Sequence, residues 1–222
     1  ISVSLPERAG IAMSKLKIHK MIVGPVQTNC YLVYNEESKE TLIIDPGDQA
    51  DRIREQIRIH QLCPCAILLT HGHFDHIMAA EELRREYDLP VYAGEEERTL
   101  TGDPSMNASR EFGVSCAVTI DRGLSDGQQL SLAGFSIRVI HTPGHTRGGV
   151  CYYFDAERVL FSGDTLFAAS VGRTDLPTGS MSQIIRSIRE KLFHLPDDTR
   201  VLPGHGEDTM IGYEKNHNPF LF

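Results

Sequence analysis

The chain has 222 residues, 41% hydrophobic and 23% charged, as is usual for a globular protein large enough to bury its own core. Its 22 basic residues (Lys and Arg) and 30 acidic residues (Asp and Glu) give a formal net charge of −8, and the sequence has no basic cluster. We therefore expect neither nucleic acid nor an anionic membrane as a partner.

The cysteines and the N-terminus indicate compartment and chain organisation. Five irregularly spaced cysteines argue against a disulfide framework and predict a cytoplasmic protein. No apolar run approaches the ~20 residues that span a bilayer. Residues 1–12 differ in composition from the rest of the chain and precede Met13, so we expect a leader or expression-derived tail, and then one domain over residues 13–222.

Strands and helices are both predicted in the first half of the chain. Four apolar-rich segments predict strands, over residues 17–23, 30–34, 41–44 and 66–69. The spacing of Ile53 and Ile57 predicts an amphipathic helix over 50–62. The strand at 66–69 is a continuous apolar run, which is typical of a buried strand, and it leads directly into Thr70 and His71.

The next segment predicts a helix over residues 77–87, with Asp75 near its N-cap position. Further short elements are expected after it: a strand at 91–93, a helix at 95–100 and a loop over 101–115.

In the second half, residues 117–161 are strand-like and repeatedly interrupted by glycine, with a hairpin predicted around Ala133-Gly134. A helix is predicted over 181–192 from its apolar face, and Val201-Leu202 reads as the last strand. Antiparallel hairpins together with strand–helix alternation predict an α/β (α+β) fold.

The strongest chemical signal is His71-Gly72-His73-Phe74-Asp75-His76, directly after the buried strand. His71 and His73 lie two residues apart, so in extended geometry their rings point the same way and can bind one ion. The chain then turns, which places Asp75 and His76 nearer a second ion. Imidazole and carboxylate ligands suit zinc, iron or manganese. The competing interpretation, a solvated polar loop, does not account for such a density of histidine.

Three further polar residues follow predicted strands and lie in Gly-rich turns: His145, Asp164 and His205. Each alone is a weak signal, because a single His in a Gly-Pro turn is more often a hydrogen-bonded loop residue. Together they share one logic, with candidate ligands at strand ends where glycine lets the backbone pack closely.

The order of these motifs resembles the metallo-β-lactamase superfamily over residues 13–222. Within it, four segments resemble the glyoxalase II (hydroxyacylglutathione hydrolase) branch in its short, single-domain form: 142–146, 163–167, 172–173 and 218–221. The resemblance implies a four-layer αββα sandwich, with two mixed sheets and helices on the outer faces. It also implies a hydrolase domain that cleaves S-acyl (hydroxyacyl) glutathione-type thioesters.

The resemblance assigns the site residues as well. The first ion would be held by His71, His73 and His145; the second by Asp75, His76 and His205; and Asp164 would bridge both. Asp75 and Asp164 are therefore the expected catalytic carboxylates. Asp45, in Ile44-Asp45-Pro46-Gly47, resembles a structural carboxylate that supports the ligands from behind.

Two divalent ions are the expected cofactors, zinc by preference, with iron and manganese as alternatives. Such a pair can lower the pKa of a bridging water from ~15.7 to about 7, and the resulting hydroxide would attack the thioester. Arg173 could bind a carboxylate of a small anionic substrate, or it could simply pair with Asp175. Residues 206–222 leave no room for the helical extension that binds glutathione in full-length relatives, so the thiol carrier and the oligomeric state stay open.

Two alternatives stay open at this point. A persulfide dioxygenase, which uses one iron, also has a Gly-Arg-Thr-Asp run like residues 172–175, but the retained second ligand set favours the hydrolase. A metal-binding sensor without turnover is the alternative from another class, and the loss of a ligand would indicate it. No ligand is lost here.

Overall fold

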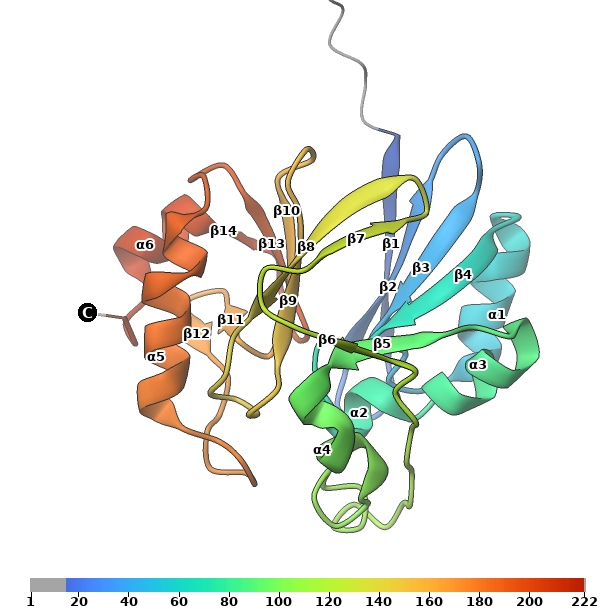
Figure 1. The fold of residues 1–222 in the computed structure, drawn as a ribbon, viewed down its shortest axis with the longest axis horizontal. Helices are drawn as coiled ribbons and strands as arrows, with labels where there is room; N and C mark the ends of the chain where they lie inside the picture. The colour runs from blue at the N-terminus through green and yellow to red at the C-terminus, as the bar shows by residue number, and fades with distance from the viewer. Residues whose placement is uncertain (1–14, 222) are drawn as a thin grey trace, which may run out of the picture.

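The structure, a computed structural model, describes residues 15–221, so the predicted leader over 1–12 lies outside the described residues. Two six-stranded mixed sheets face each other (Figure 1). The first sheet runs in the order β1-β2-β3-β4-β5-β6. Its strands are β1 (Leu16–Val23), β2 (Thr28–Asn35), β3 (Glu40–Ile44), β4 (Cys63–Leu68), β5 (Val91–Gly94) and β6 (Arg122–Leu124).

The second sheet runs in the order β14-β13-β10-β9-β8-β7. Its strands are β7 (Gln129–Leu132), β8 (Phe135–His141), β9 (Val150–Phe154), β10 (Val159–Gly163), β13 (Arg200–Pro203) and β14 (Thr209–Met210). The predicted hairpin at Ala133-Gly134 is confirmed, since β7 and β8 pair antiparallel on either side of it. A small separate ribbon is formed by β11 (Leu166–Phe167) and β12 (Ser170–Val171).

Helices cover the outer face of each sheet. The first sheet carries α1 (Ala50–Ile59) and α3 (Ala80–Tyr87), and the second carries α5 (Met181–Glu190), η2 (Leu192–His194) and α6 (Ile211–His217). Short helical turns lie at one end of the sandwich: α2 (Phe74–Ile77), η1 (Glu95–Glu97) and α4 (Arg98–Gly102). The predicted αββα sandwich is therefore confirmed.

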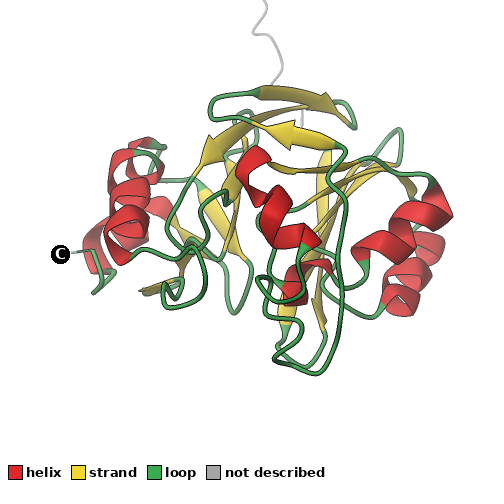
Figure 2. Ribbon diagram, turned by 60° about the horizontal axis from the view of Figure 1, so that its bottom comes forward, coloured by secondary structure: helices red, strands yellow, loops and turns green. Residues whose placement is uncertain are grey.

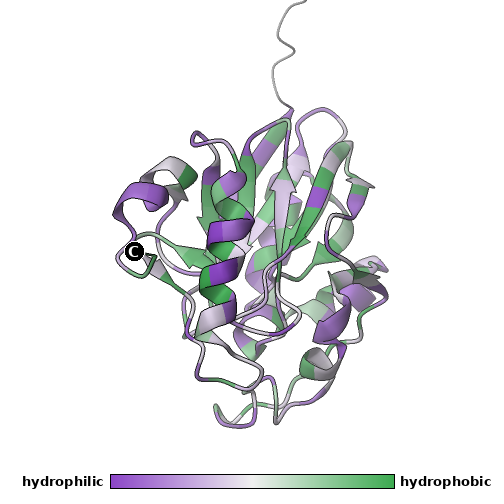
Figure 3. Ribbon diagram, turned by 60° about the vertical axis from the view of Figure 1, so that its left-hand side comes forward, coloured by the Kyte–Doolittle hydropathy of each residue, from purple (hydrophilic) through white to green (hydrophobic). Residues whose placement is uncertain are grey.

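The alternation of side chains along the strands explains the four layers. In β2, Leu32 packs under the helices of the first sheet, whereas its neighbours Tyr31 and Val33 point into the core between the sheets. In β9, Tyr152 enters that central core and Tyr153 packs under α5. Figure 3 shows hydrophilic and hydrophobic bands alternating along α5, as expected of a helix with one buried face.

The predicted helix over 77–87 was wrong at its start. Asp75 is the second residue of α2, and α3 begins only at Ala80. The break arises because the amide of Ala79 donates to Pro46 O at 3.0 Å instead of to the carbonyl one helical turn earlier. Asp75 thus caps no helix, and its carboxylate accepts a hydrogen bond from Thr28 Oγ1 at 3.1 Å.

Val201-Leu202 is not the last strand, because β14 pairs antiparallel with β13 through two residues and α6 follows. A two-residue strand is too short to leave a period-2 pattern in the sequence. The strand-like region that begins at 117 forms a strand only from Arg122. Among residues 15–221, no helix is both long and apolar enough to cross a membrane.

Candidate metal centre

Four strands from the two sheets end near one another, and each is followed by a loop that carries candidate ligands. The segment after β4 carries His71, His73, Asp75 and His76, the last two of them in α2, and the loops after β8, β10 and β13 carry His145, Asp164 and His205. Figure 2 brings this end of the sandwich forward and shows loops and short helical segments between the outer helices of the two sheets. The first sheet thus contributes four candidate ligands and the second sheet three.

All seven predicted ligand residues converge. His73 Nδ1 lies 2.9 Å from His145 Nε2, and His76 Nε2 lies 3.3 Å from His205 Nε2. Asp164 lies between these pairs, with its carboxylate oxygens 3.5 Å from His145 Nε2 and 3.4 Å from His76 Nε2. Ligands about 2.0–2.1 Å from a tetrahedral ion would be about 3.3 Å apart, so this spacing suits coordination.

Three sets of donor atoms lie within 4.8 Å of one another and could each hold an ion. The sets are His71, His73 and His145; His71, His76 and Asp164; and Asp75, His76 and His205. The first and third are the two sets that the family resemblance implies, and the second links Asp164 to a member of each. The histidine and carboxylate clusters therefore fit a binuclear metal centre.

Several buried donor atoms at this centre have no hydrogen-bond partner within residues 15–221. They are His71 Nε2, His73 Nε2 and Asp164 Oδ1. A buried polar atom without a hydrogen bond is costly and is rare in folded proteins. A bound cation would supply the missing partner of His71 Nε2 and Asp164 Oδ1, and this is the observation that supports the fit to metal ions.

Outer hydrogen bonds orient two of the rings. His76 Nδ1 lies 2.9 Å from Asp45 Oδ2, and His145 Nδ1 lies 2.7 Å from the carbonyl of Arg173. With Nδ1–H donating outward, the Nε2 lone pair faces the centre, as a metal ligand requires. Asp45 also accepts from the amide of Thr70 at 2.7 Å, and its φ of 49° places it in the left-handed region. Such strain is concentrated at functional sites.

Two histidines of the first set, His71 and His73, are held neutral. Burial lowers the pKa of His71 well below its usual value, and the nearby His76 and His145 lower it further. Burial, followed by the charge of His145, lowers the pKa of His73 to about 3. Neutral imidazole is the form that binds metals, so these rings need no deprotonation at pH 7.

In the second set, by contrast, neighbouring carboxylates favour the charged form of His76. Burial alone would lower the pKa of His76, but the carboxylates of Asp164, Asp75 and Asp45 raise it well above its usual value. Burial alone would raise the pKa of Asp164, but His76 lowers it far below. Three carboxylates around one buried imidazole create a negative potential that a divalent cation would neutralise.

Comparison with known proteins decides the family. The profile of the metallo-beta-lactamase superfamily matches residues 23–205. The chain belongs to this superfamily. Among its relatives is the probable metallo-hydrolase YqgX of Bacillus subtilis, 40% identical over 93% of this chain and 98% of YqgX. The hydroxyacylglutathione hydrolase GloC of Haemophilus influenzae is 37% identical over 93% of this chain and 98% of GloC.

Two solved structures are closely similar. A B3 metallo-beta-lactamase, BLEG-1, is 44% identical, with a TM-score of 0.88 over 92% of this chain and 99% of BLEG-1. TTHA1623, described in a di-iron-bound form, is 39% identical, with a TM-score of 0.82 over 91% of this chain and all of TTHA1623. The superfamily comparisons and the converged clusters together support a metal-dependent hydrolase.

Glu97 supports the centre and was missed by sequence reasoning. Its side chain is buried, with 1% exposure, and burial raises its pKa. Its carboxylate accepts from the amides of Gly72 and Gly148, each at 2.7 Å. Gly72 lies between His71 and His73, so one carboxylate ties this loop to the loop that carries His145. Within the run Glu95-Glu96-Glu97, nothing in the sequence marks the third residue as the buried one.

The His205 loop has its own brace, also missed. Tyr31 Oη donates to Pro203 O at 2.6 Å, and Asn29 Nδ2 donates to the same carbonyl at 2.9 Å. Gly204 packs so closely that a Cβ there would lie 2.2 Å from Asp164 Oδ1. Glycine is therefore required at this position by the approach of the ligand itself.

Three histidines without a predicted role have their contacts elsewhere. His141 Nε2 bonds to the carbonyl of Arg147 at 2.8 Å, and the rings of His19 and His60 are 5.1 Å apart on the first sheet's side. All five cysteines are free, as predicted, and Cys63 is exposed. Arg173 pairs with Asp175 through Nε to Oδ1 at 2.7 Å, and it also lines the cavity over the centre.

Proposed function

We propose that the protein hydrolyses S-acyl thioesters, of the hydroxyacylglutathione type or close to it, with two metal ions. The observation that carries the proposal is the complete set of seven donor residues, six of them grouped around Asp164. The hydroxyacylglutathione hydrolase GloC, 37% identical over nearly its whole length, supports the choice of a thioester. The donors lie at the base of a cavity of about 430 Å³, lined by His73, Asp75, His145, Asp164 and His205 among others.

When bound, two divalent ions would supply Lewis acidity toward the substrate carbonyl and an activated water. The protein's own part is to preorganise this chemistry. Asp45 and the carbonyl of Arg173 fix the rings of His76 and His145, and Glu97 fixes the spacing of their loops. A thiolate is a good leaving group, so the mechanism needs no strong general acid. Zinc, iron and manganese all suit these nitrogen and oxygen donors, with zinc our first choice.

The single-iron dioxygenase is less well supported. It would leave Asp75, His76 and His205 without a role, although His205 Nε2 lies 3.2 Å from Asp75 Oδ2 in a tight cluster. A sensor without turnover is disfavoured by the cavity that opens over the centre. The 44% identity with the B3 metallo-beta-lactamase BLEG-1 makes a β-lactam the appropriate comparison substrate.

The test compares three substrates on purified, metal-analysed protein. We expect S-D-lactoylglutathione to be hydrolysed with no oxygen consumed, as followed by absorbance and an oxygen electrode, and with two ions bound per chain. Oxygen uptake with glutathione persulfide would replace the proposal by the dioxygenase. Hydrolysis of a chromogenic cephalosporin without thioester hydrolysis would replace it by a β-lactamase.

Arg173 is proposed to bind the anionic end of the substrate. Its guanidinium is exposed, so Arg173→Ala is expected to raise KM for anionic thioesters by roughly two- to fivefold, as for an exposed ion pair worth up to about 1 kcal/mol. The effect on kcat should be smaller, because the contact is the same in ground and transition states. Arg138→Ala, which removes another exposed Arg–Asp pair, is the control. An unchanged KM would indicate that Arg173 only pairs with Asp175 and does not bind the substrate.

A further inference from the structure

The cavity over the metal centre has apolar walls that the hydrolytic chemistry does not use. Six side chains form them: Val26, Phe74, Ala108, Phe112, Phe167 and Leu176. A larger hollow among the described residues, about 630 Å³, lies over α1 and α3, and five of its ten lining residues are charged. The cavity at the metal centre, by contrast, combines apolar walls with the proposed ligands.

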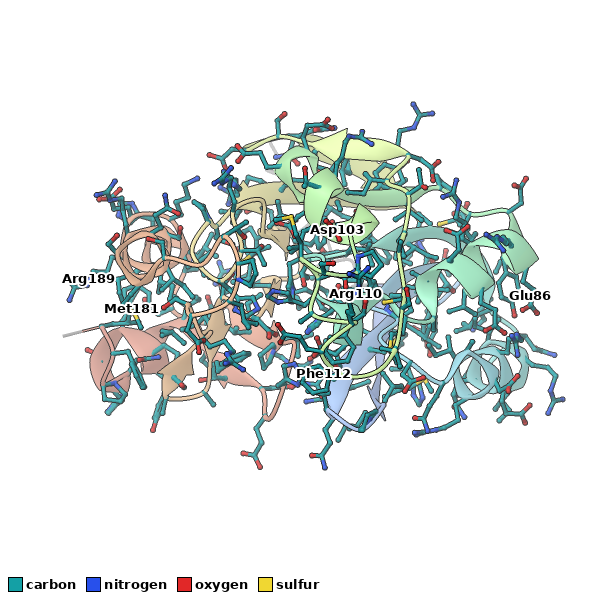
Figure 4. The ribbon with its side chains drawn as sticks, turned by 90° about the horizontal axis from the view of Figure 1, so that it is seen from below. Glu86, Asp103, Arg110, Phe112, Met181 and Arg189 are labelled. Atoms are coloured by element: carbon teal, nitrogen blue, oxygen red, sulfur yellow. The ribbon has the colours of Figure 1, made fainter. Side chains whose placement is uncertain are left out.

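Phe112 is the most exposed part of these walls. It is 61% exposed, yet its ring stacks on Phe74 with centroids 4.5 Å apart and an interplanar angle of 29°. Phe74 is itself buried and lies between His73 and Asp75 in the chain. Figure 4, which views the molecule from below, shows Phe112 near the middle of this face. The two rings thus form a shelf that leads from solvent to the proposed ligands.

The shelf is held in place by the loop that carries it. The amide of Phe74 donates to the carbonyl of Asn107 at 2.9 Å, and the fully buried Asn107 donates through Nδ2 to the carbonyl of Cys116 at 2.9 Å. The amide of Val114 donates to Ser109 O at 3.0 Å and closes a turn around Phe112. Phe112 is therefore presented by a braced loop.

The apolar walls come from both halves of the chain, and Phe167 and Leu176 lie in the same half as Arg173. Arg173, which we propose for the anionic end of the substrate, comes from the second half of the chain. The Phe74–Phe112 shelf and Val26 come from the first half. A thioester has an arm on each side of its carbonyl, so an anionic arm bound at Arg173 would leave the acyl arm to reach the shelf.

We propose that the Phe74–Phe112 shelf binds the acyl group of the substrate and selects apolar acyl chains over acetyl. This inference rests on the proposed thioester hydrolysis. Apolar area removed from water on the shelf lowers the free energy of the bound state, and a fully buried methylene contributes a factor of roughly four. On a partly open shelf we expect a roughly two- to fourfold gain in kcat/KM for each added methylene.

The experiment measures kcat/KM for S-acetyl-, S-butyryl- and S-hexanoylglutathione on the metal-loaded protein. The value should rise along the series, and Phe112→Ala should reduce the hexanoyl-to-acetyl ratio by roughly tenfold. Phe112→Leu, which keeps an apolar side chain, should retain most of the ratio. Phe220→Ala is the matched control, because Phe220 is 50% exposed and does not line the cavity; it should leave the ratio unchanged.

A binding measurement gives a readout independent of turnover. By calorimetry, the inert thioether S-hexylglutathione should bind more tightly than S-methylglutathione, and Phe112→Ala should remove most of this difference. Equal kcat/KM for acetyl and hexanoyl thioesters, or a ratio unaffected by Phe112→Ala, would overturn the proposed acyl binding by the shelf. The proposed thioester hydrolysis would then still stand. Absence of any thioester hydrolysis would instead overturn the proposed function.

Discussion

Asp164→Ala is expected to abolish thioester hydrolysis and to lower the metal content of the purified protein. The carboxylate lies 3.4–3.6 Å from His76, His145 and His205, so it is placed between both ligand sets. Loss of a residue behind a metal ligand typically costs roughly 10- to 100-fold in affinity or activity. Loss of a ligand shared by both ions should exceed that range.

Metal stoichiometry by plasma mass spectrometry and kcat/KM for S-D-lactoylglutathione are the two measurements for this variant. Asp155→Ala is the control, because it removes an exposed carboxylate paired with Arg138, a type of pair that contributes little. Unaltered hydrolysis with two ions retained by Asp164→Ala would contradict the proposed bridging position.

Glu97→Gln is expected to weaken metal binding at the first set by roughly 10- to 100-fold, although the side chain contacts no ligand atom. The amide side chain offers one acceptor oxygen where the carboxylate offers two. Either Gly72 or Gly148 therefore loses its partner, and a buried amide without an acceptor costs about 1–3 kcal/mol. The loops that carry His73 and His145 are then no longer tied together.

The measurement is chelator competition, which gives the affinity of each ion. Glu96→Gln is a closely matched control, since Glu96 is the exposed neighbour of Glu97. Asn29→Ala provides the contrast, because Asn29 braces the His205 loop and its loss should affect the second set first. If each variant lowers the affinity for both ions equally, the hydrogen bonds of Glu97 and Asn29 do not act on one loop alone.

The sequence predicted the fold well where side chains alternate or run together. The apolar run at 66–69 and the paired hydrophobic segments in the second half became β4 and the β7–β10 meander. The prediction failed where a backbone group hydrogen-bonds to a residue that is distant in the chain. The break before α3 depends on Pro46, and β14 exists only because β13 lies beside it. Neither contact leaves a local pattern.

In the candidate site, the sequence identified the ligands and missed the residues that support them. Histidine is rare enough that His71, His73 and His76 stand out, and the loops after β8, β10 and β13 bring His145, Asp164 and His205 to them. The supports are invisible in the sequence, because any of three successive glutamates could be the buried one. The carbonyl of Arg173 that holds His145 is a backbone atom, which no residue type reveals.

The division of the ligands between the two sheets affects how the protein matures. Four ligands come from the first sheet and three from the second, so neither half of the chain contains a full ligand set for either ion. During synthesis, which proceeds from the N-terminus, the first set is complete only after His145 has emerged, and the second only after β13 has emerged and His205 has folded back beside β2. Binding of the metal ions is thus a late event in folding. Bound ions would link the two halves of the chain, and the free energy of unfolding would then rise with the logarithm of the metal concentration.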